Sequence, residues 1–198
     1  MPGTRPPAIQ HDPSRERLDI AGHDDGPATP YPIYLHGWVT RGFGRGSKDL
    51  GCPTANLPDS SIQGVPVKTG VHFGYARVLG CGGHAEVYPM VMSIGWNPFY
   101  NNDTRTAEVH VLHDYPSDFY GKELRVVMLG FIRPEYNYAS LDALIKDINH
   151  DKVVAATSVQ RPAYSAYSED AFFSKPTDLA PLPAGEDPSR PREKPQQP

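Results

Sequence analysis

Alternation between apolar and polar residues dominates the middle of this chain, and it limits the fold more than any other feature. Side chains on a β-strand point to opposite faces in turn, so a period of two predicts strands with one buried face. Short connections that contain Gly, Pro or Asn separate the alternating segments, which is typical of strands joined by turns. Apolar or small residues occupy every second position in five segments: 33–39, 71–75, 90–94, 107–111 and 124–128. We therefore expect five or six strands.

One helix is predicted to follow these strands. Apolar residues recur at helical spacing between Leu141 and Ile148. Ser140 precedes them as a candidate N-cap, and Asp142 lies in the first turn. Strands in sequence with short connections favour an antiparallel sheet closed into a barrel, because closure leaves no exposed edge. The expected fold class is therefore all-β, a small closed antiparallel β-barrel of about six strands with a C-terminal helix packed against it.

The two ends of the chain differ from its middle. Residues 1–30 contain six prolines and no aromatic residue, and residues 174–198 contain seven prolines and no aromatic residue. Segments of this composition bury too little apolar surface to offset the entropy of ordering. We expect a disordered N-terminal tail at 1–30, one folded domain at 31–173, and a disordered C-terminal tail at 174–198.

Charge and composition exclude several classes of partner. The net charge is −4, the isoelectric point is near 6.0 and basic residues are scattered, so nucleic acid is not an expected partner. No apolar run approaches the ~20 residues of a membrane span, and no secretory leader is visible. Cys52 and Cys81 form no paired motif, so both are expected to be reduced core thiols. We expect a cytoplasmic monomer.

A glycine-rich stretch leads into a Pro-Thr-Ala-Asn motif between Arg41 and Asn56, where the chain reads R-G-F-G-R-G-S-K-D-L-G-C-P-T-A-N. Glycines let backbone N–H groups approach and converge on phosphate oxygens, and neighbouring cations add positive charge. The order Gly-Ser-Lys excludes a Walker loop, and the glycine spacing excludes a dinucleotide fingerprint. Taken alone, G-x-G-x-G is more typical of a charged surface hairpin than of a phosphate site. The candidate phosphate-binding residues are Gly42, Gly44, Arg45, Gly46 and Lys48.

Polar side chains on two strands offer further chemistry. Thr54 and Asn56 are two residues apart, so on a strand they share a face and present two neutral oxygens to Mg²⁺. Glu108 shares the polar face of another strand with Thr106 and His110, where spacing alone fits a solvated glutamate equally well. His110 and His113 are three apart on a strand with no third ligand at a convincing spacing, so a zinc site has little support.

The whole string from Arg41 to Asn56 resembles the signature of the riboflavin kinase family. Three later stretches resemble that family in the same order: Ser93–Pro98, the run around Glu108, and 118–134. The resemblance spans about residues 31–173 and implies a Greek-key barrel. It further implies transfer of the γ-phosphoryl group of ATP to the ribityl 5′-hydroxyl of riboflavin, which forms FMN.

The resemblance also assigns roles to single residues. Glu108 is implied as the general base, and Thr54 and Asn56 as ligands of a divalent ion that arrives with ATP; Mg²⁺ is expected, and the sequence does not separate it from Zn²⁺ or Mn²⁺. Flavin contacts fall on Arg133, Glu135 and Tyr138, among aromatic residues that could equally be core. The implied ATP-binding residues are Gly42, Gly44, Arg45, Gly46, Lys48, Thr54, Val111, His113 and Tyr120.

Other functions stay open at this level. A non-catalytic flavin- or nucleotide-binding barrel would carry the same fold, and a kinase for another polyol would carry the same phosphate loop. A nucleic-acid-binding barrel is disfavoured by the charge. The upstream segment is too short for an FMN adenylyltransferase domain, so we expect an enzyme that stops at FMN.

Overall fold

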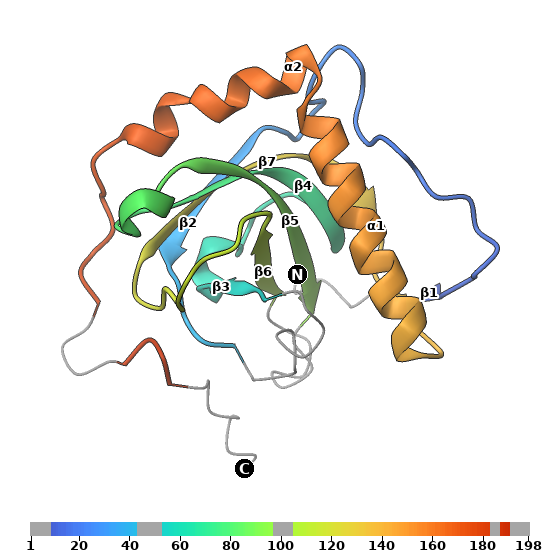
Figure 1. The fold of residues 1–198 in the computed structure, drawn as a ribbon, viewed down its shortest axis with the longest axis horizontal. Helices are drawn as coiled ribbons and strands as arrows, with labels where there is room; N and C mark the ends of the chain where they lie inside the picture. The colour runs from blue at the N-terminus through green and yellow to red at the C-terminus, as the bar shows by residue number, and fades with distance from the viewer. Residues whose placement is uncertain (1–8, 43–52, 97–104, 183–186, 191–198) are drawn as a thin grey trace.

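One curled sheet forms the body of the protein (Figure 1). The computed structural model describes residues 9–42, 53–96, 105–182 and 187–190. Six antiparallel strands follow one another in the order β2-β7-β4-β5-β6-β3. Their bounds are β2 (Ile33–Trp38), β3 (Ala55–Leu57), β4 (Gly70–Val78), β5 (Val87–Trp96), β6 (Arg105–Val111) and β7 (Glu123–Arg133).

The strand order confirms the predicted antiparallel barrel class with its Greek-key connection. Strands β4, β5 and β6 pair consecutively, and β7 returns by a longer connection to lie beside β4, which is the Greek-key arrangement. The two outermost strands also meet, because the Thr40 N–H just after β2 donates to the Asn56 carbonyl of β3 at 3.0 Å. This contact brings the two edges of the curled sheet together at one point.

Apolar side chains fill both faces of the central strands. The inner core contains most of the predicted alternating residues, among them the fully buried Met92, Ile94 and Val126, but the predicted run Val71, Phe73 and Tyr75 belongs to a second core instead. A second core lies on the outer face, where Phe73 of β4 packs with residues of the C-terminal helix. With a core on each face, β4 and β7 are buried along almost their whole length. Each such side chain contributes roughly 1.5–3 kcal/mol through removal of apolar surface from water.

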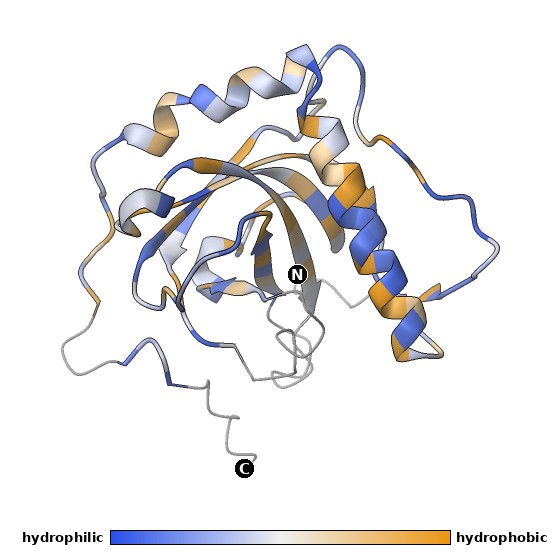
Figure 2. Ribbon diagram, in the orientation of Figure 1, coloured by the Kyte–Doolittle hydropathy of each residue, from blue (hydrophilic) through white to orange (hydrophobic). Residues whose placement is uncertain are grey.

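The C-terminal helix α1 (Leu141–Val159) begins where the sequence predicts. The Ser140 hydroxyl accepts the Ala143 N–H at 3.2 Å and so satisfies one of the donors at the helix start. The helix continues past Ile148, and the apolar stripe that predicted it is not its most buried side: Leu141 is exposed, whereas Asp147 and Asp151 are buried together with Val154, Ala155, Ser158 and Val159. Figure 2 shows these hydrophilic and hydrophobic bands along α1.

Short helical turns complete the fold. After α1 the chain passes through α2 (Pro162–Ser165) and two 3₁₀ turns, η4 (Ala166–Glu169) and η5 (Ala171–Ser174), which arch over one end of the sheet in Figure 1. Two further 3₁₀ turns, η1 (Asp59–Ser61) and η2 (Gly82–His84), lie in connections between strands.

The expectation that residues 1–30 form a disordered tail is not met by residues 9–30. The short strand β1 (Ile9–Gln10) pairs in parallel with β8 (Tyr136–Asn137), and the chain then follows α1 (Figure 1). Ala21 is 1% exposed, and its N–H donates to the Ser158 hydroxyl of α1 at 2.9 Å. We call residues 9–25 the N-terminal strap. Polar contacts hold much of it, and a composition argument that counts only apolar burial overlooks them.

The described part of the C-terminal segment also contacts the sheet. The Trp38 indole N–H donates to the Ala180 carbonyl at 2.8 Å, and the Arg125 guanidinium donates to the Lys175 carbonyl at 2.7 Å. Arg125 is 2% exposed and pairs with Glu123 at 2.7 Å, so this segment lies over a buried ion pair. Residues 174–182 and 187–190 therefore differ from the expected disordered tail for the same reason as the strap.

Candidate active site

Glu108 lies at the centre of a polar group on the outer face of the sheet. Ala107 and Val109 of β6 point into the core, so Glu108 between them points outward and is half-buried. Asn56 of β3 is its cross-strand partner, and the Thr54 hydroxyl donates to its carboxylate at 3.3 Å. The sequence predicted the separate strand faces, and the pairing of β3 with β6 places the candidate base beside both candidate metal ligands.

Gly42 brings the glycine-rich stretch against this group. A Cβ atom at position 42 would lie 2.7 Å from Nδ2 of Asn56, so any larger residue here would force the Asn56 side chain to shift. The other candidate phosphate-binding residues, Gly44, Arg45, Gly46 and Lys48, lie outside the described residues.

The oxygen donors here fit a magnesium ion that is shared with a nucleotide. Thr54 supplies a hydroxyl and Asn56 an amide carbonyl, and these are hard oxygen ligands of the kind that Mg²⁺ takes. Both are neutral, so phosphate oxygens would have to supply the negative charge. Among the described residues there is no cluster of three or more His, Cys, Asp or Glu side chains that could hold a metal by itself.

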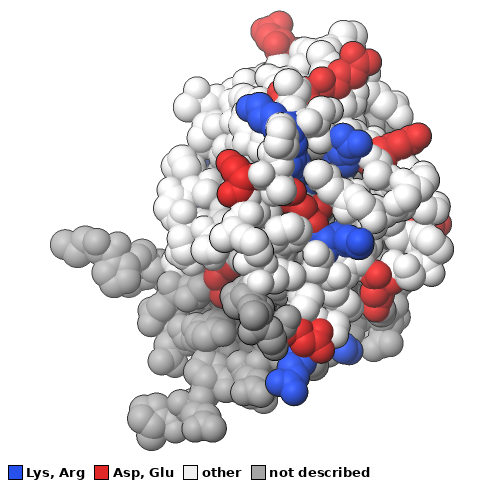
Figure 3. All heavy atoms as spheres, turned by 90° about the vertical axis from the view of Figure 1, so that its left-hand side faces the viewer, with Lys and Arg blue, Asp and Glu red and all other residues white. Residues whose placement is uncertain are grey.

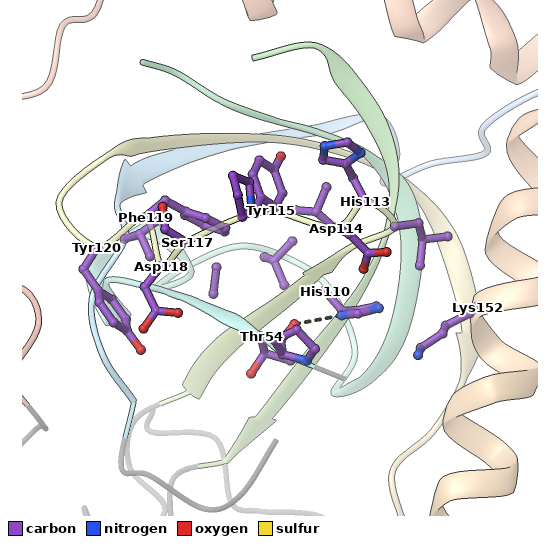
Figure 4. Close-up of a pocket in the computed structure, with 17 residues that line it drawn as sticks. Thr54, His110, His113, Asp114, Tyr115, Ser117, Asp118, Phe119, Tyr120 and Lys152 are labelled. Atoms are coloured by element: carbon purple, nitrogen blue, oxygen red, sulfur yellow. Dashed lines mark hydrogen bonds between the residues drawn. The ribbon is translucent and has the colours of Figure 1, made fainter. Parts of the chain in front are cut away.

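A cavity of about 510 Å³ opens beside Thr54 (Figure 4). This volume is in the range of small-molecule sites. The cavity is bounded by the end of β6 and by the loop that follows it. Three predicted ATP-contact residues, Val111, His113 and Tyr120, line it, together with two further aromatic residues, Tyr115 and Phe119. The structure thus brings these five residues together around one cavity, with Thr54 at its edge.

His110 attaches the strand of Glu108 to the Pro-Thr-Ala-Asn motif. Its Nδ1 lies 2.8 Å from the Pro53 carbonyl, so an N–H there donates and holds the backbone before Thr54 against β6. Burial lowers the pKa of His110, and the nearby Lys152 ammonium lowers it further, which keeps the ring neutral. Figure 4 shows Lys152 extending from α1 toward this side of the cavity. Lys152 was not predicted, because only tertiary packing brings the helix here.

The predicted flavin residues gather at the other end of the same sheet face, beside α1. The Arg133 guanidinium forms a two-pronged pair with Asp151, with Nε at 3.0 Å from both carboxylate oxygens and Nη2 at 2.7 Å from one. The Tyr138 hydroxyl donates to Asp147 at 2.7 Å. Burial and this hydrogen bond to a carboxylate raise the pKa of Tyr138, so it remains a donor at physiological pH.

Glu135 connects the two ends of the site. Its carboxylate lies against Gly95 of β5, where the Cβ of any other residue would overlap it. Gly95 pairs with Thr106, and Ser93 pairs with Glu108. Since residues two apart on a strand share a face at about 7 Å, Glu135 and Glu108 lie over neighbouring positions of one sheet face. Ser93 and Gly95 form the floor between them; the sequence motif contained both, but nothing in it indicated this role.

Charges on the surface are mixed in sign. Figure 3 shows Lys and Arg interspersed with Asp and Glu on one face of the described residues, without a continuous basic area. Within the same residues, no helix is both long and apolar enough to cross a membrane.

Comparison with known proteins shows the family of this chain. Residues 29–159 match the flavokinase family model, which is described as riboflavin kinase. The chain belongs to the riboflavin kinase family. A riboflavin kinase from Pyricularia oryzae is 50% identical over 162 residues, which cover 75% of this chain and 81% of that protein. One from Aspergillus fumigatus is 42% identical over 191 residues and covers 78% and 89%.

A solved structure supports the fold as well. The crystal structure of riboflavin kinase from Trypanosoma brucei superposes with a TM-score of 0.62 at 29% identity, and the match covers 78% of this chain and 97% of that one. The family is one of ATP-dependent phosphotransferases.

Proposed function

We propose that this protein is a riboflavin kinase that transfers the γ-phosphoryl group of ATP to the ribityl 5′-hydroxyl of riboflavin and releases FMN and ADP. The observation that carries the proposal is the contact among Thr54, Asn56 and Glu108 at the edge of the cavity, in a chain of this family. Phosphoryl transfer needs a positioned nucleophile, neutralised phosphate oxygens and a bridging metal, and each need has a candidate in this group.

Glu108 is proposed as the general base. The ribityl hydroxyl would lose its proton to the Glu108 carboxylate as its oxygen attacks the γ-phosphorus and the bond to the ADP oxygen breaks. The Thr54 hydroxyl, which donates to that carboxylate, would fix its orientation. A divalent ion, with Mg²⁺ expected, would be held by Thr54 and Asn56 and would neutralise charge on the phosphates when bound.

The cavity is proposed to take the nucleoside part of ATP. Its lining combines aromatic and aliphatic side chains with polar groups, as is usual for a base-binding pocket. The phosphates would then point toward Thr54 and Gly42. Riboflavin would lie along the sheet face from Ser93 and Gly95 toward α1, with its ring near Arg133, Glu135 and Tyr138 and its ribityl chain directed to Glu108.

The test is chromatographic detection of FMN after incubation with riboflavin, ATP and Mg²⁺, with wild type beside Glu108→Gln. We expect FMN from the wild type and a loss of kcat of roughly 10²–10⁴-fold in the variant, with riboflavin and ATP binding retained. Folded protein that binds flavin but forms no FMN would identify a non-catalytic binding barrel instead. Turnover of Glu108→Gln near the wild-type rate would refute the assignment of the base.

A further inference from the structure

A buried carboxylate on α1 is paired mainly by the N-terminal strap. Asp147 is 0% exposed. Arg15 Nη2 lies 2.5 Å from its Oδ2, Arg17 Nη2 lies 2.7 Å from its Oδ1, and His11 Nε2 lies 3.5 Å from Oδ2. Arg15 therefore hydrogen-bonds Oδ2 from 132 residues away in sequence, and Arg17 forms an ion pair with Oδ1 without a hydrogen bond.

A buried charge of this kind requires its partners. Burial acts to raise the pKa of Asp147, but hydrogen bonds from Tyr138 and Arg15 and the charges of Arg15 and Arg133 outweigh it, so the net shift is downward and Asp147 is ionised. Without the strap, a carboxylate on the barrel side of α1 would lose two arginines and would have to take up water or move.

The same carboxylate holds a residue of the candidate flavin end. Asp147 Oδ2 accepts the Tyr138 hydroxyl at 2.7 Å as well as Arg15, so one oxygen connects the strap to Tyr138. One turn further along α1, Asp151 holds Arg133. Residues four apart on a helix share a face, so any movement of α1 at Asp147 also moves the partner of Arg133.

The strap contacts the flavin segment directly too. Strand β1 pairs with β8, which immediately precedes Tyr138. The His11 ring lies 4.6 Å from the Tyr138 ring, and the Arg15 guanidinium lies 4.6 Å from the centre of the Tyr136 ring. Backbone pairing, ring contact and the shared carboxylate thus hold the segment that carries Tyr138 from three directions.

From these contacts we propose that the N-terminal strap is a working part of the riboflavin end of the site, and that Arg15 and Arg17 are positioning residues that act through Asp147 on Tyr138. The proposal rests on the proposed function, in which Tyr138 and Arg133 contact the flavin. The proposal predicts an effect on riboflavin binding and none on ATP binding. The strap contacts the flavin end, whereas none of its described contacts reaches the lining of the cavity proposed for ATP.

Equilibrium binding of each substrate to the full chain tests this. Riboflavin fluorescence quenching and ATP titration calorimetry would be run on wild type, Arg15→Ala with Arg17→Ala, Arg15→Lys with Arg17→Lys, Tyr138→Phe, and Tyr138→Phe added to the double alanine variant. The matched control is Arg77→Ala. Arg77 also donates two part-buried hydrogen bonds, to the carbonyls of Ala85 and Phe173, but it does not contact Asp147. Arg17→Ala alone replaces the double alanine variant if the latter does not fold.

We expect the double alanine variant to raise the riboflavin Kd about tenfold while the ATP Kd stays within about twofold, and the double lysine variant to recover part of the loss. Tyr138→Phe should add little in the double alanine background, because both changes break one linkage. Arg77→Ala should leave both Kd values near wild type.

Other results would overturn the proposal in distinguishable ways. If Tyr138→Phe weakens riboflavin binding and the double alanine variant does not, the strap has no positioning role and the flavin assignment stands. If Arg77→Ala weakens riboflavin binding equally, the effect is general destabilisation and the strap proposal fails. If Tyr138→Phe itself leaves riboflavin binding unchanged, the flavin assignment of the proposed function fails and the strap proposal fails with it.

Discussion

Mild acid should destabilise this protein through His72. The side chain lies on β4 and is 0% exposed. Its Nδ1 lies 3.0 Å from the Tyr31 hydroxyl and its Nε2 lies 3.1 Å from the Lys68 carbonyl. A neutral ring satisfies both contacts, because Nε2–H donates to the carbonyl and Nδ1 accepts from the tyrosine. Burial among Tyr31 and Phe131 lowers the pKa of His72 from 6.5 to about 4.

The sign and size of the effect follow from that shift. The unfolded chain takes up a proton near pH 6.5, whereas the folded protein resists protonation until about pH 4. The contribution of His72 to the free energy of unfolding is therefore complete above pH 6.5. It is lost as the pH falls from 6.5 toward the folded pKa of about 4. Between pH 7 and pH 5 the free energy of unfolding should fall by about 2 kcal/mol from this residue alone.

Denaturant unfolding of wild type and His72→Gln at pH 7.5, 6 and 5 measures this contribution. Glutamine keeps a donor for the Lys68 carbonyl but does not titrate. Other groups, including His110, titrate in both proteins and cancel in the difference. We expect the variant to be less stable at pH 7.5 but to lose about 2 kcal/mol less than wild type on acidification. Parallel losses in the two proteins would refute the reasoning, because the buried ring would then not be the group that couples folding to pH.

Three further outcomes can be measured directly. Thr54→Ala with Asn56→Ala should raise the Mg²⁺ concentration needed for half-maximal FMN formation at least tenfold, and an unchanged metal titration would contradict the ligand assignment. Deletion of residues 1–25 should lower the free energy of unfolding by roughly 3 kcal/mol, because Asp147 loses both arginine partners; an unchanged denaturation midpoint would show that the strap does not pack in solution. Tyr115→Phe should leave stability unchanged or raise it by up to about 1 kcal/mol, since among the described residues its buried hydroxyl has no hydrogen-bond partner. A clear loss of stability there would indicate a partner outside the described residues.

Local patterns in the sequence were sufficient for the strands and for the start of the helix. Alternation placed Ala107 and Val109 in the core and Glu108 outside it, and Ser140 marked the first turn of α1. Both results depend on the covalent geometry of neighbouring residues, which the order of the chain already contains. The Pro-Thr-Ala-Asn motif likewise placed Thr54 and Asn56 on one face, although only the pairing of β3 with β6 set them beside Glu108.

The ends of the chain were predicted less well for a physical reason. Composition measures how much apolar surface a segment can bury, and by that measure residues 9–25 bury little. Their arginines instead meet Asp147, which sits on the barrel side of a helix whose periodicity pointed to a different face. An aspartate on the barrel side is tolerated because cations far away in sequence reach it, and no local pattern records that pairing.

By itself, the sequence determined the strand faces, the helix start, the family and the residue types available for phosphoryl transfer, because each of these depends on neighbours along the chain. Only the tertiary structure decided that Val111, His113, Tyr115 and Tyr120 enclose one cavity, that Glu135 lies against Gly95, and that the N-terminal strap pairs Asp147. Those arrangements depend on which elements pack together, and charge pairing and cavity shape exist only once the sheet has curled and α1 has docked on it.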